Sequence, residues 1–135
     1  MSDTLSKEDR VKCMKSVRSK DTKPEIIVRR LVFGLGYRYR LHRKDLPGCP
    51  DLVFPRYKKV IFVHGCFWHV HEGCKHAKTP TSNVDYWSFK LERNKSRDAL
   101  NQAALLAAGW RFMIVWECEV KSIDLAEKVK NFLSL

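Results

Sequence analysis

Eleven consecutive residues near the middle of the chain carry the side chains best suited to chemistry. Residues 64–74 read HGCFWHVHEGC and hold three histidines and two cysteines. Thiolate and imidazole are common zinc ligands, and imidazole is also a frequent general base near neutral pH. The apolar run Val60–Val63 directly before them predicts a buried strand. The cluster is therefore expected at a strand end, where a rigid scaffold aims side chains at a ligand.

Four ligand-type residues predict a zinc site. Cys66 and His71 are five residues apart, Cys74 follows three residues later, and Cys118 comes at the end of a predicted strand. Three cysteines and one histidine suit a closed tetrahedral site, which would hold the irregular segment 64–84 to that strand end. The spacing is not that of a zinc finger, so three reduced, buried thiols and a surface histidine remain the alternative.

A second set combines carboxylates with the other two histidines. Asp51 stands at the head of a short apolar segment, His64 ends the next one, and His69 follows. A carboxylate can bind Mg²⁺, and a histidine can act as a base or orient water, so the set suits phosphodiester hydrolysis. Taken singly, Asp51 is equally well a turn residue and each histidine a surface group. Glu25 is a further candidate, with a helix cap as its alternative role.

Large aromatic side chains accompany these groups. On an extended segment, the adjacent Phe67 and Trp68 would point to opposite faces and would not share one core. Aromatic side chains beside a basic site can stack on bases or wedge between base pairs. Trp87 is a third candidate, and core packing is an equally good interpretation of it.

Composition points to a polyanionic partner. The 135 residues have a formal charge of +11, and residues 1–44 alone hold 13 Lys or Arg against 5 Asp or Glu. Nucleic acid is the first candidate, and a solvated basic surface is the alternative. We expect neither a membrane segment nor a signal peptide, and we therefore expect a cytoplasmic protein. An odd count of five cysteines argues against a disulfide framework.

The elements that must position these residues follow from periodicity and capping. Helices are expected at 6–18, 22–35, 85–108 and 122–133, and strands at 37–41, 51–54, 59–63 and 110–116. The order predicts a single α/β domain with a mixed sheet flanked by helices. A hairpin of the second and third strands would bring Asp51 beside residues 63 and 64. On the long helix, Trp87, Leu91, Leu100 and Leu106 are expected to face the core.

Three stretches resemble the very short patch repair endonucleases, the Vsr family. They are Pro50-Asp51-Leu52-Val53, the run FVHGCFWH at 62–69, and residues 109–118, which begin GWR and end VWEC. The resemblance extends from the region of Met14 to Cys118. It implies a restriction-endonuclease-like α/β fold with a structural zinc. It also implies a Mg²⁺-dependent nick 5′ of the T in a T:G mismatch, the product of 5-methylcytosine deamination.

The resemblance also implies roles for individual residues. Asp51 is similar to the family's Mg²⁺-binding carboxylate, the Val63 position supplies a backbone carbonyl to the metal, and Glu25 reaches it through water. His69 is expected to activate water and His64 to orient it. The implied zinc ligands are Cys66, His71, Cys74 and Cys118. The implied DNA-contacting residues are Phe67, Trp68 and Trp87, with Met14 inserting from a basic N-terminal arm at 1–20.

One departure from the family pattern concerns the zinc ligands. The interval from His71 to Cys74 is one residue longer than expected, and Gly73 is expected to absorb it as a bulge. The implied partners are duplex DNA with a T:G mismatch and mismatch-repair proteins, in the cytoplasm of a bacterium at the nucleoid. A monomer is expected, because a lone mismatch has no two-fold symmetry. A nuclease with another mismatch or sequence specificity, and a zinc-stabilised DNA-binding module without catalysis, remain alternatives.

Overall fold

A four-stranded sheet forms the centre of the structure, a computed structural model that describes residues 22–74 and 82–134. The strands are β1 (Arg40–Leu41), β2 (Leu52–Phe54), β3 (Lys59–His64) and β4 (Arg111–Trp116), in that spatial order. The first three are antiparallel, and β4 runs parallel to β3. The predicted mixed sheet is confirmed. The expected helix at 6–18, with Met14 and the basic arm, lies outside the described residues.

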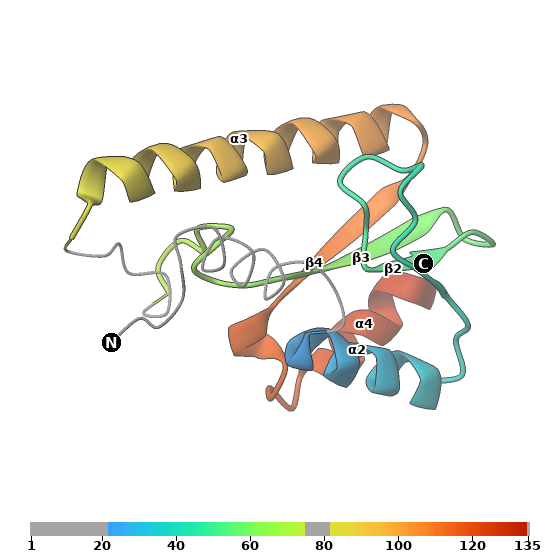
Figure 1. Cartoon of the computed structure of the whole chain (residues 1–135). Helices are drawn as coiled ribbons and strands as arrows, with labels where there is room; N and C mark the ends of the chain where they lie inside the picture. Colours follow the sequence, from blue (N-terminus) through green and yellow to red (C-terminus); the bar gives the residue numbers. More distant parts are fainter. Residues whose placement is uncertain (1–21, 75–81, 135) are drawn as a thin grey trace.

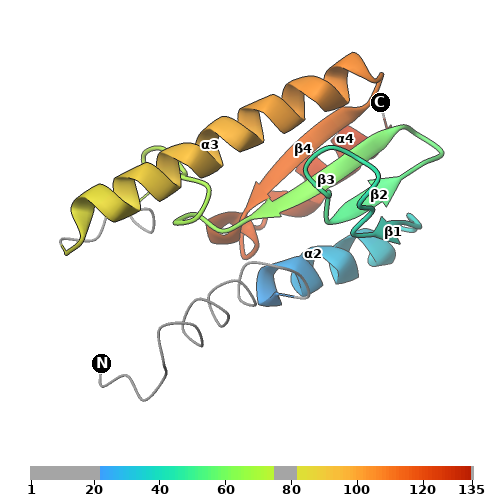
Figure 2. The ribbon, with the colours of Figure 1, turned by 45° about the horizontal axis from the view of Figure 1, so that its top comes forward.

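Helices cover both faces of the sheet. Helices α2 (Lys23–Gly34) and α4 (Leu125–Ser134) lie on one face, and α3 (Val84–Ala107) crosses the other (Figures 1 and 2). Because successive strand residues point to opposite faces, Leu52 and Ile61 pack with α2 and α4. Val53 and Val60 instead pack on the other face, with Leu105 of α3.

Strand register brings the candidate residues to one end of the sheet. Leu52 pairs with Ile61, so the preceding Asp51 lies at the open end of the β2–β3 hairpin. His64 ends β3 opposite Trp116, the last residue of β4. The chain leaves these two ends toward Cys66 and Cys118. Segments far apart in sequence therefore meet at one edge of the sheet.

Local signals set the ends of α2 as predicted. The Thr22 side chain accepts a hydrogen bond from the Glu25 backbone N–H at 3.3 Å and caps the helix. Gly36, with φ of +93°, follows the last turn in a conformation that favours glycine. Because its own backbone is capped by Thr22, Glu25 can direct its carboxylate elsewhere.

The first strand is shorter than expected. Only Arg40 and Leu41 pair with β2, which itself has three residues. The next residue, His42, has φ of +48° and so leaves the extended region. The strand predicted over residues 37–41 was therefore wrong at its beginning, where Tyr37 and Tyr39 pack against the core without pairing.

The buried face of α3 also differs from the expectation. Leu100 is 72% exposed and Leu106 is also exposed, whereas Leu91, Asn94 and Leu105 are buried. The helix touches the rest of the molecule with a narrow stripe, so most of its apolar residues face solvent. Within residues 22–74 and 82–134, no helix is long and apolar enough to cross a membrane.

Candidate active site

Two carboxylates and an imidazole meet where α2, β1 and β2 come together. Ligand atoms of Glu25, His42 and Asp51 lie within 4.8 Å of one another. Glu25 is 1% exposed, and its Oε2 accepts hydrogen bonds from Arg29 and from His42 Nε2, the latter at 2.7 Å. Asp51 Oδ2 accepts from the Val63 N–H at 2.7 Å. The predicted approach of Asp51 to the third strand is confirmed.

The carboxylates of this cluster carry an electrostatic cost. The pKa of Asp51 is raised to about 8, chiefly by burial and also by the Glu25 carboxylate, against the opposing effect of the Val63 N–H. Ionising two carboxylates this close together costs free energy because their negative charges repel. A cation between them relieves this repulsion. Their oxygens are the donors that Mg²⁺ prefers. The donor set therefore fits a divalent cation.

Two histidines stack beside this cluster. The rings of His64 and His69 are 3.7 Å apart and 8° from parallel. His69 Nδ1 lies 2.6 Å from Asp98 Oδ2. Because a carboxylate oxygen accepts, Nδ1 donates this bond and leaves Nε2 as the acceptor of a neutral ring. The pair of His69 and Asp98 thus has the geometry of an oriented general base.

His64 is buried and uncharged at neutral pH. Burial lowers its pKa to about 3, and the adjacent His69 contributes to the lowering while Asp98 opposes it. Its Nδ1 is buried without a hydrogen-bond partner among the described residues. A buried polar atom of this kind usually has a partner such as ordered water. In the stacked pair, His69 is therefore an oriented base, and His64 is a neutral ring whose Nδ1 is available for a hydrogen bond.

A single cavity joins the two groups. Its volume is about 590 Å³, and its lining includes His42, Asp51 and Val63 together with His64, His69 and Asp98. Lys44 adds a positive charge to the same wall. A phosphodiester entering this space would meet the buried carboxylate, the stacked imidazoles and the lysine.

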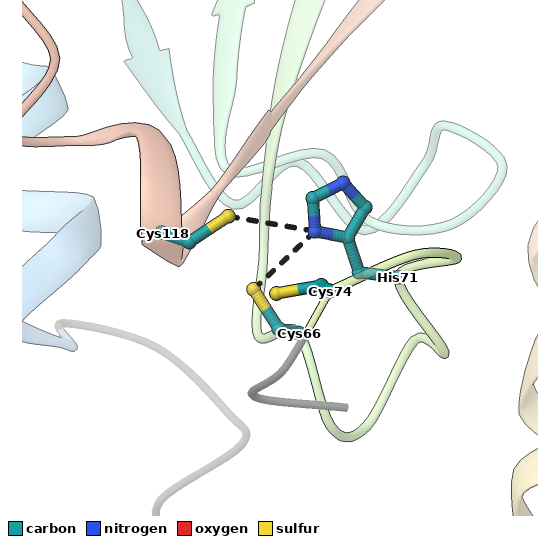
Figure 3. A group of neighbouring side chains, drawn as sticks. All are labelled: Cys66, His71, Cys74 and Cys118. Carbon is teal, nitrogen blue, oxygen red and sulfur yellow. Dashed lines mark hydrogen bonds between the residues drawn. The ribbon is translucent and has the colours of Figure 1, made fainter. Parts of the chain in front are cut away.

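A separate cluster lies beyond the strand ends. Ligand atoms of Cys66, His71, Cys74 and Cys118 are within 4.8 Å of one another, and Figure 3 shows the sulfurs and the ring turned toward a common centre. His71 Nδ1 is 3.4 Å from Cys118 Sγ and 3.6 Å from Cys66 Sγ. Zinc bond lengths in a tetrahedron give a nitrogen–sulfur separation of about 3.6 Å. The donor set and spacing therefore fit zinc.

Gly73 forms a left-handed turn between His71 and Cys74. It has φ of +72°, and a Cβ placed there would meet nothing within 4 Å. The left-handed turn directly precedes Cys74, which belongs to the cluster. In the absence of a cation, burial raises the pKa of the Cys66 thiol to about 12. Binding of zinc would replace those protons, since thiolate is the ligand form.

Val70, a residue with a left-handed backbone, lies between His69 and His71, which belong to different clusters. His69 turns to His64 and Asp98, whereas His71 turns to Cys66 and Cys118. On an extended strand, residues two apart share a face. Val70 has φ of +53°, an uncommon conformation for a β-branched residue, and this turn diverts the two rings to different clusters.

The aromatic residues gather next to the histidines. Ring centroids of Phe67 and Trp68 are 5.0 Å apart, and Trp87 lies 5.4 Å from Phe67 and 5.9 Å from Trp68. The extended segment assumed for Phe67 and Trp68 was wrong. Residues 66–70 form turns, with His69 N–H donating to the Gly65 carbonyl, so both rings pack edge to face. All three rings remain partly exposed.

Sequence reasoning missed two residues of this site, Asp98 and His42. Asp98 lies 29 positions from its partner, so no local motif connects them. A signal exists in α3, where Leu91, Asn94, Asp98 and Leu105 recur at helical intervals. Asn94 is buried and donates to the Trp68 carbonyl at 3.2 Å. Polar residues within the buried stripe of a helix indicate partners on the element beneath it.

Comparisons of the sequence with known proteins identify the family. A sequence model of the family described as DNA mismatch endonuclease Vsr matches residues 2–76. The Type II nicking enzyme V.XorIIP of Xanthomonas oryzae pv. oryzae is 53% identical over 134 residues, 98% of each chain. The DNA mismatch endonuclease Vsr of Escherichia coli is 39% identical over 121 residues, 90% of this chain and 77% of that protein. This chain therefore belongs to the Vsr family of DNA mismatch endonucleases.

Proposed function

We propose that this protein is a Mg²⁺-dependent endonuclease that nicks DNA on the 5′ side of the T in a T:G mismatch. Such mismatches arise when 5-methylcytosine is deaminated, and the nick would begin very short patch repair. The observation that carries the proposal is the convergence of Asp51, His64 and His69 on one cavity. Family membership and the names of the relatives, a mismatch endonuclease and a nicking enzyme, support it.

The proposed chemistry begins with a water molecule in the cavity. His69 Nε2 takes a proton from this water as it attacks phosphorus, because Asp98 already occupies Nδ1. Asp98 then stabilises the protonated ring. His64 is neutral at the working pH and orients water in the site. As the new phosphorus–oxygen bond forms, the bond to the leaving oxygen breaks.

Divalent cation binding is assigned to the carboxylate cluster. Asp51 and the Val63 backbone carbonyl would hold Mg²⁺, with Glu25 acting through water. When bound, the ion would neutralise charge that develops on the phosphate. Burial of Asp51 beside Glu25 supports the assignment, because the cluster gains most from a nearby cation.

The second cluster is proposed as a structural zinc site with Cys66, His71, Cys74 and Cys118 as ligands. A closed set of four protein ligands leaves no position for substrate, which is typical of structural zinc. Around it, the mixed sheet and its flanking helices are proposed to be a restriction-endonuclease-like core.

DNA recognition is proposed for the aromatic group. Phe67, Trp68 and Trp87 are partly exposed and already packed together, so they can enter a weakened mismatch as one wedge. Lys90, whose Nζ lies 5.8 Å from the Trp68 ring centroid, places positive charge beside them. We propose a monomer that acts on bacterial DNA in the cytoplasm, with mismatch-repair proteins as partners.

A nicking assay tests the proposal directly. End-labelled duplexes carrying T:G, each other mismatch or a matched pair would be incubated with the intact chain, with and without Mg²⁺. We expect one product, cut 5′ of the mismatched T, that requires Mg²⁺. Cleavage of another mismatch would favour a nuclease of different specificity. Tight binding with no cleavage of any duplex would favour a non-catalytic DNA-binding module.

A further inference from the structure

His42 connects the two acidic residues of the cluster, Glu25 and Asp51. Its backbone N–H donates to the Asp51 carbonyl at 3.2 Å, which extends the β1–β2 pairing by one bond. Its Nε2 donates to Glu25 Oε2 at 2.7 Å. One residue therefore ties the first turn of α2 to the head of β2.

The backbone of His42 directs its ring toward α2. Its φ of +48° ends β1 and turns the side chain out of the strand direction. A residue other than glycine adopts this conformation rarely, and it persists when surrounding contacts hold it. The side chain is 16% exposed and lines the same cavity as Asp51.

Glu25 has a competing partner in its own helix. Arg29, one turn later, also bonds Oε2 of Glu25. Arg29 alone would draw the carboxylate along α2, and the nearby Asp51 carboxylate would repel it. His42 approaches from the Asp51 side, so its bond keeps Glu25 within 4.8 Å of Asp51.

We propose that His42 is a positioning residue whose Nε2–H bond holds the Glu25 carboxylate where it can share a divalent cation with Asp51. This inference rests on the proposed function, which supplies the cation. His42 acts through Glu25, and its imidazole need not touch the metal. A glutamine places an amide N–H near the position of Nε2, whereas an asparagine is too short to reach Glu25.

The test compares His42→Asn with His42→Gln in the full chain. Asparagine tolerates the left-handed backbone, so the fold should survive. Binding of Mn²⁺ alone would be followed by electron paramagnetic resonance, with Asp51→Asn marking the site and circular dichroism reporting the fold. We expect His42→Asn to weaken Mn²⁺ binding about 10–100-fold, as loss of a supporting partner does, and His42→Gln to stay near the parent.

Nicking at increasing Mg²⁺ provides the second measurement. For His42→Asn we expect a higher Mg²⁺ requirement, with the rate largely restored at saturating Mg²⁺, and unchanged binding of mismatched DNA. Parent-like Mn²⁺ binding by folded His42→Asn would overturn the inference. Equal weakening in His42→Gln would also overturn it, because the imidazole itself would then be needed.

Failure of the proposed function has a different signature. A parent chain that binds Mn²⁺ through Asp51 but cuts no T:G duplex would contradict the proposed reaction and leave the comparison of His42 variants decisive. A parent chain that binds no Mn²⁺ would overturn both. Misfolding of both variants would show that His42 is needed for the fold and would also reject the positioning role.

Discussion

The two metal-competent clusters are built in opposite ways. Glu25 and Asp51 sit in the first turn of a capped helix and at the head of a strand, held by hydrogen bonds to Arg29, His42 and Val63. The cysteine cluster draws three of its four members from turns between residues 66 and 74, and the fourth from the short 3₁₀ helix Glu117–Glu119. Regular structure therefore preforms the first cluster, whereas the second depends on what its members bind.

The same difference applies to charge. Without a cation, the raised pKa of Asp51 shows that the ionised form of this carboxylate is disfavoured in the folded state. Without a cation, the raised pKa of Cys66 keeps the thiol neutral at physiological pH. Without a cation the carboxylate cluster would cost folding free energy, whereas without zinc the cysteine cluster would fail to hold its loop. Removing ligands from the two clusters should change stability in opposite directions.

The largest effect is expected from Cys74→Ala. Loss of one ligand should release zinc and free the segment that carries His69 and the aromatic group, since structural zinc supports folding. The lost stability should be a large share of the roughly 5–15 kcal/mol typical of a domain. Thermal unfolding by circular dichroism, metal analysis and nicking should all show the loss.

Cys49→Ser is the matched control for that experiment. Cys49 is exposed and lies outside the four-residue cluster. The control should retain one zinc per chain. An unchanged melting curve for Cys74→Ala would contradict the structural role of the cysteine cluster.

The second effect separates activity from stability. Asp51→Asn should abolish Mg²⁺-dependent nicking, because the buried carboxylate is removed while asparagine Oδ1 can still accept the Val63 N–H. When both proteins are measured without Mg²⁺, the variant should melt at a higher temperature than the parent, because it lacks the destabilised Asp51 carboxylate. Nicking and thermal unfolding, measured on the same preparations, check both parts.

The sign of the pH dependence follows from the raised pKa. The unfolded pKa of an aspartate is about 3.9, and the folded value for Asp51 is about 8. The folded state binds this proton more tightly, so the parent should lose stability as pH rises between these values. The melting-temperature advantage of Asp51→Asn should grow over the same window. A constant difference from pH 5 to pH 8 would show that Asp51 is not buried in this way.

The third effect concerns the hydrogen bond between Asp98 and His69. Asp98→Asn can present its N–H₂ to His69 Nδ1 and so favour the wrong tautomer of the ring. We expect a fall of about 100-fold in the nicking rate with binding of mismatched DNA unchanged. Glu92→Gln, an exposed change on the same helix, is the control. Equal rates for the two variants would remove Asp98 from the mechanism.

Local sequence signals predicted the parts that depend on neighbours in the chain. Three features depend only on residues close together in the sequence. They are the Thr22 cap, the hairpin that brings Asp51 to Val63, and the close interval from Cys66 to Cys74. Periodicity also predicted α3, since its bounds differ from the expectation by a residue at each end.

Contacts set by packing were not predictable in the same way. Which side of α3 faces the sheet depends on where the helix crosses it, so Leu100 was placed inside and Asp98 went unnoticed. The position of the His42 ring depends on a positive φ, and because this residue is not a glycine, the sequence does not signal that conformation. The side-by-side use of His69 and His71 in different clusters likewise depends on one left-handed residue between them.

Substitution of Val70 is expected to have the smallest effect. Val70 holds φ of +53°, where a Cβ with two methyl groups is strained, so Val70→Gly should relieve strain of about 1–2 kcal/mol. Glycine also loses about 0.5–1 kcal/mol to chain entropy, so the backbone terms together favour glycine by about 0–1.5 kcal/mol, and the lost packing of the Val70 side chain reduces this gain. Val70→Ala keeps the Cβ and the strained backbone but loses packing, so it should melt below the parent. If Val70→Gly instead melts below Val70→Ala, the left-handed backbone at residue 70 is not strained in the parent.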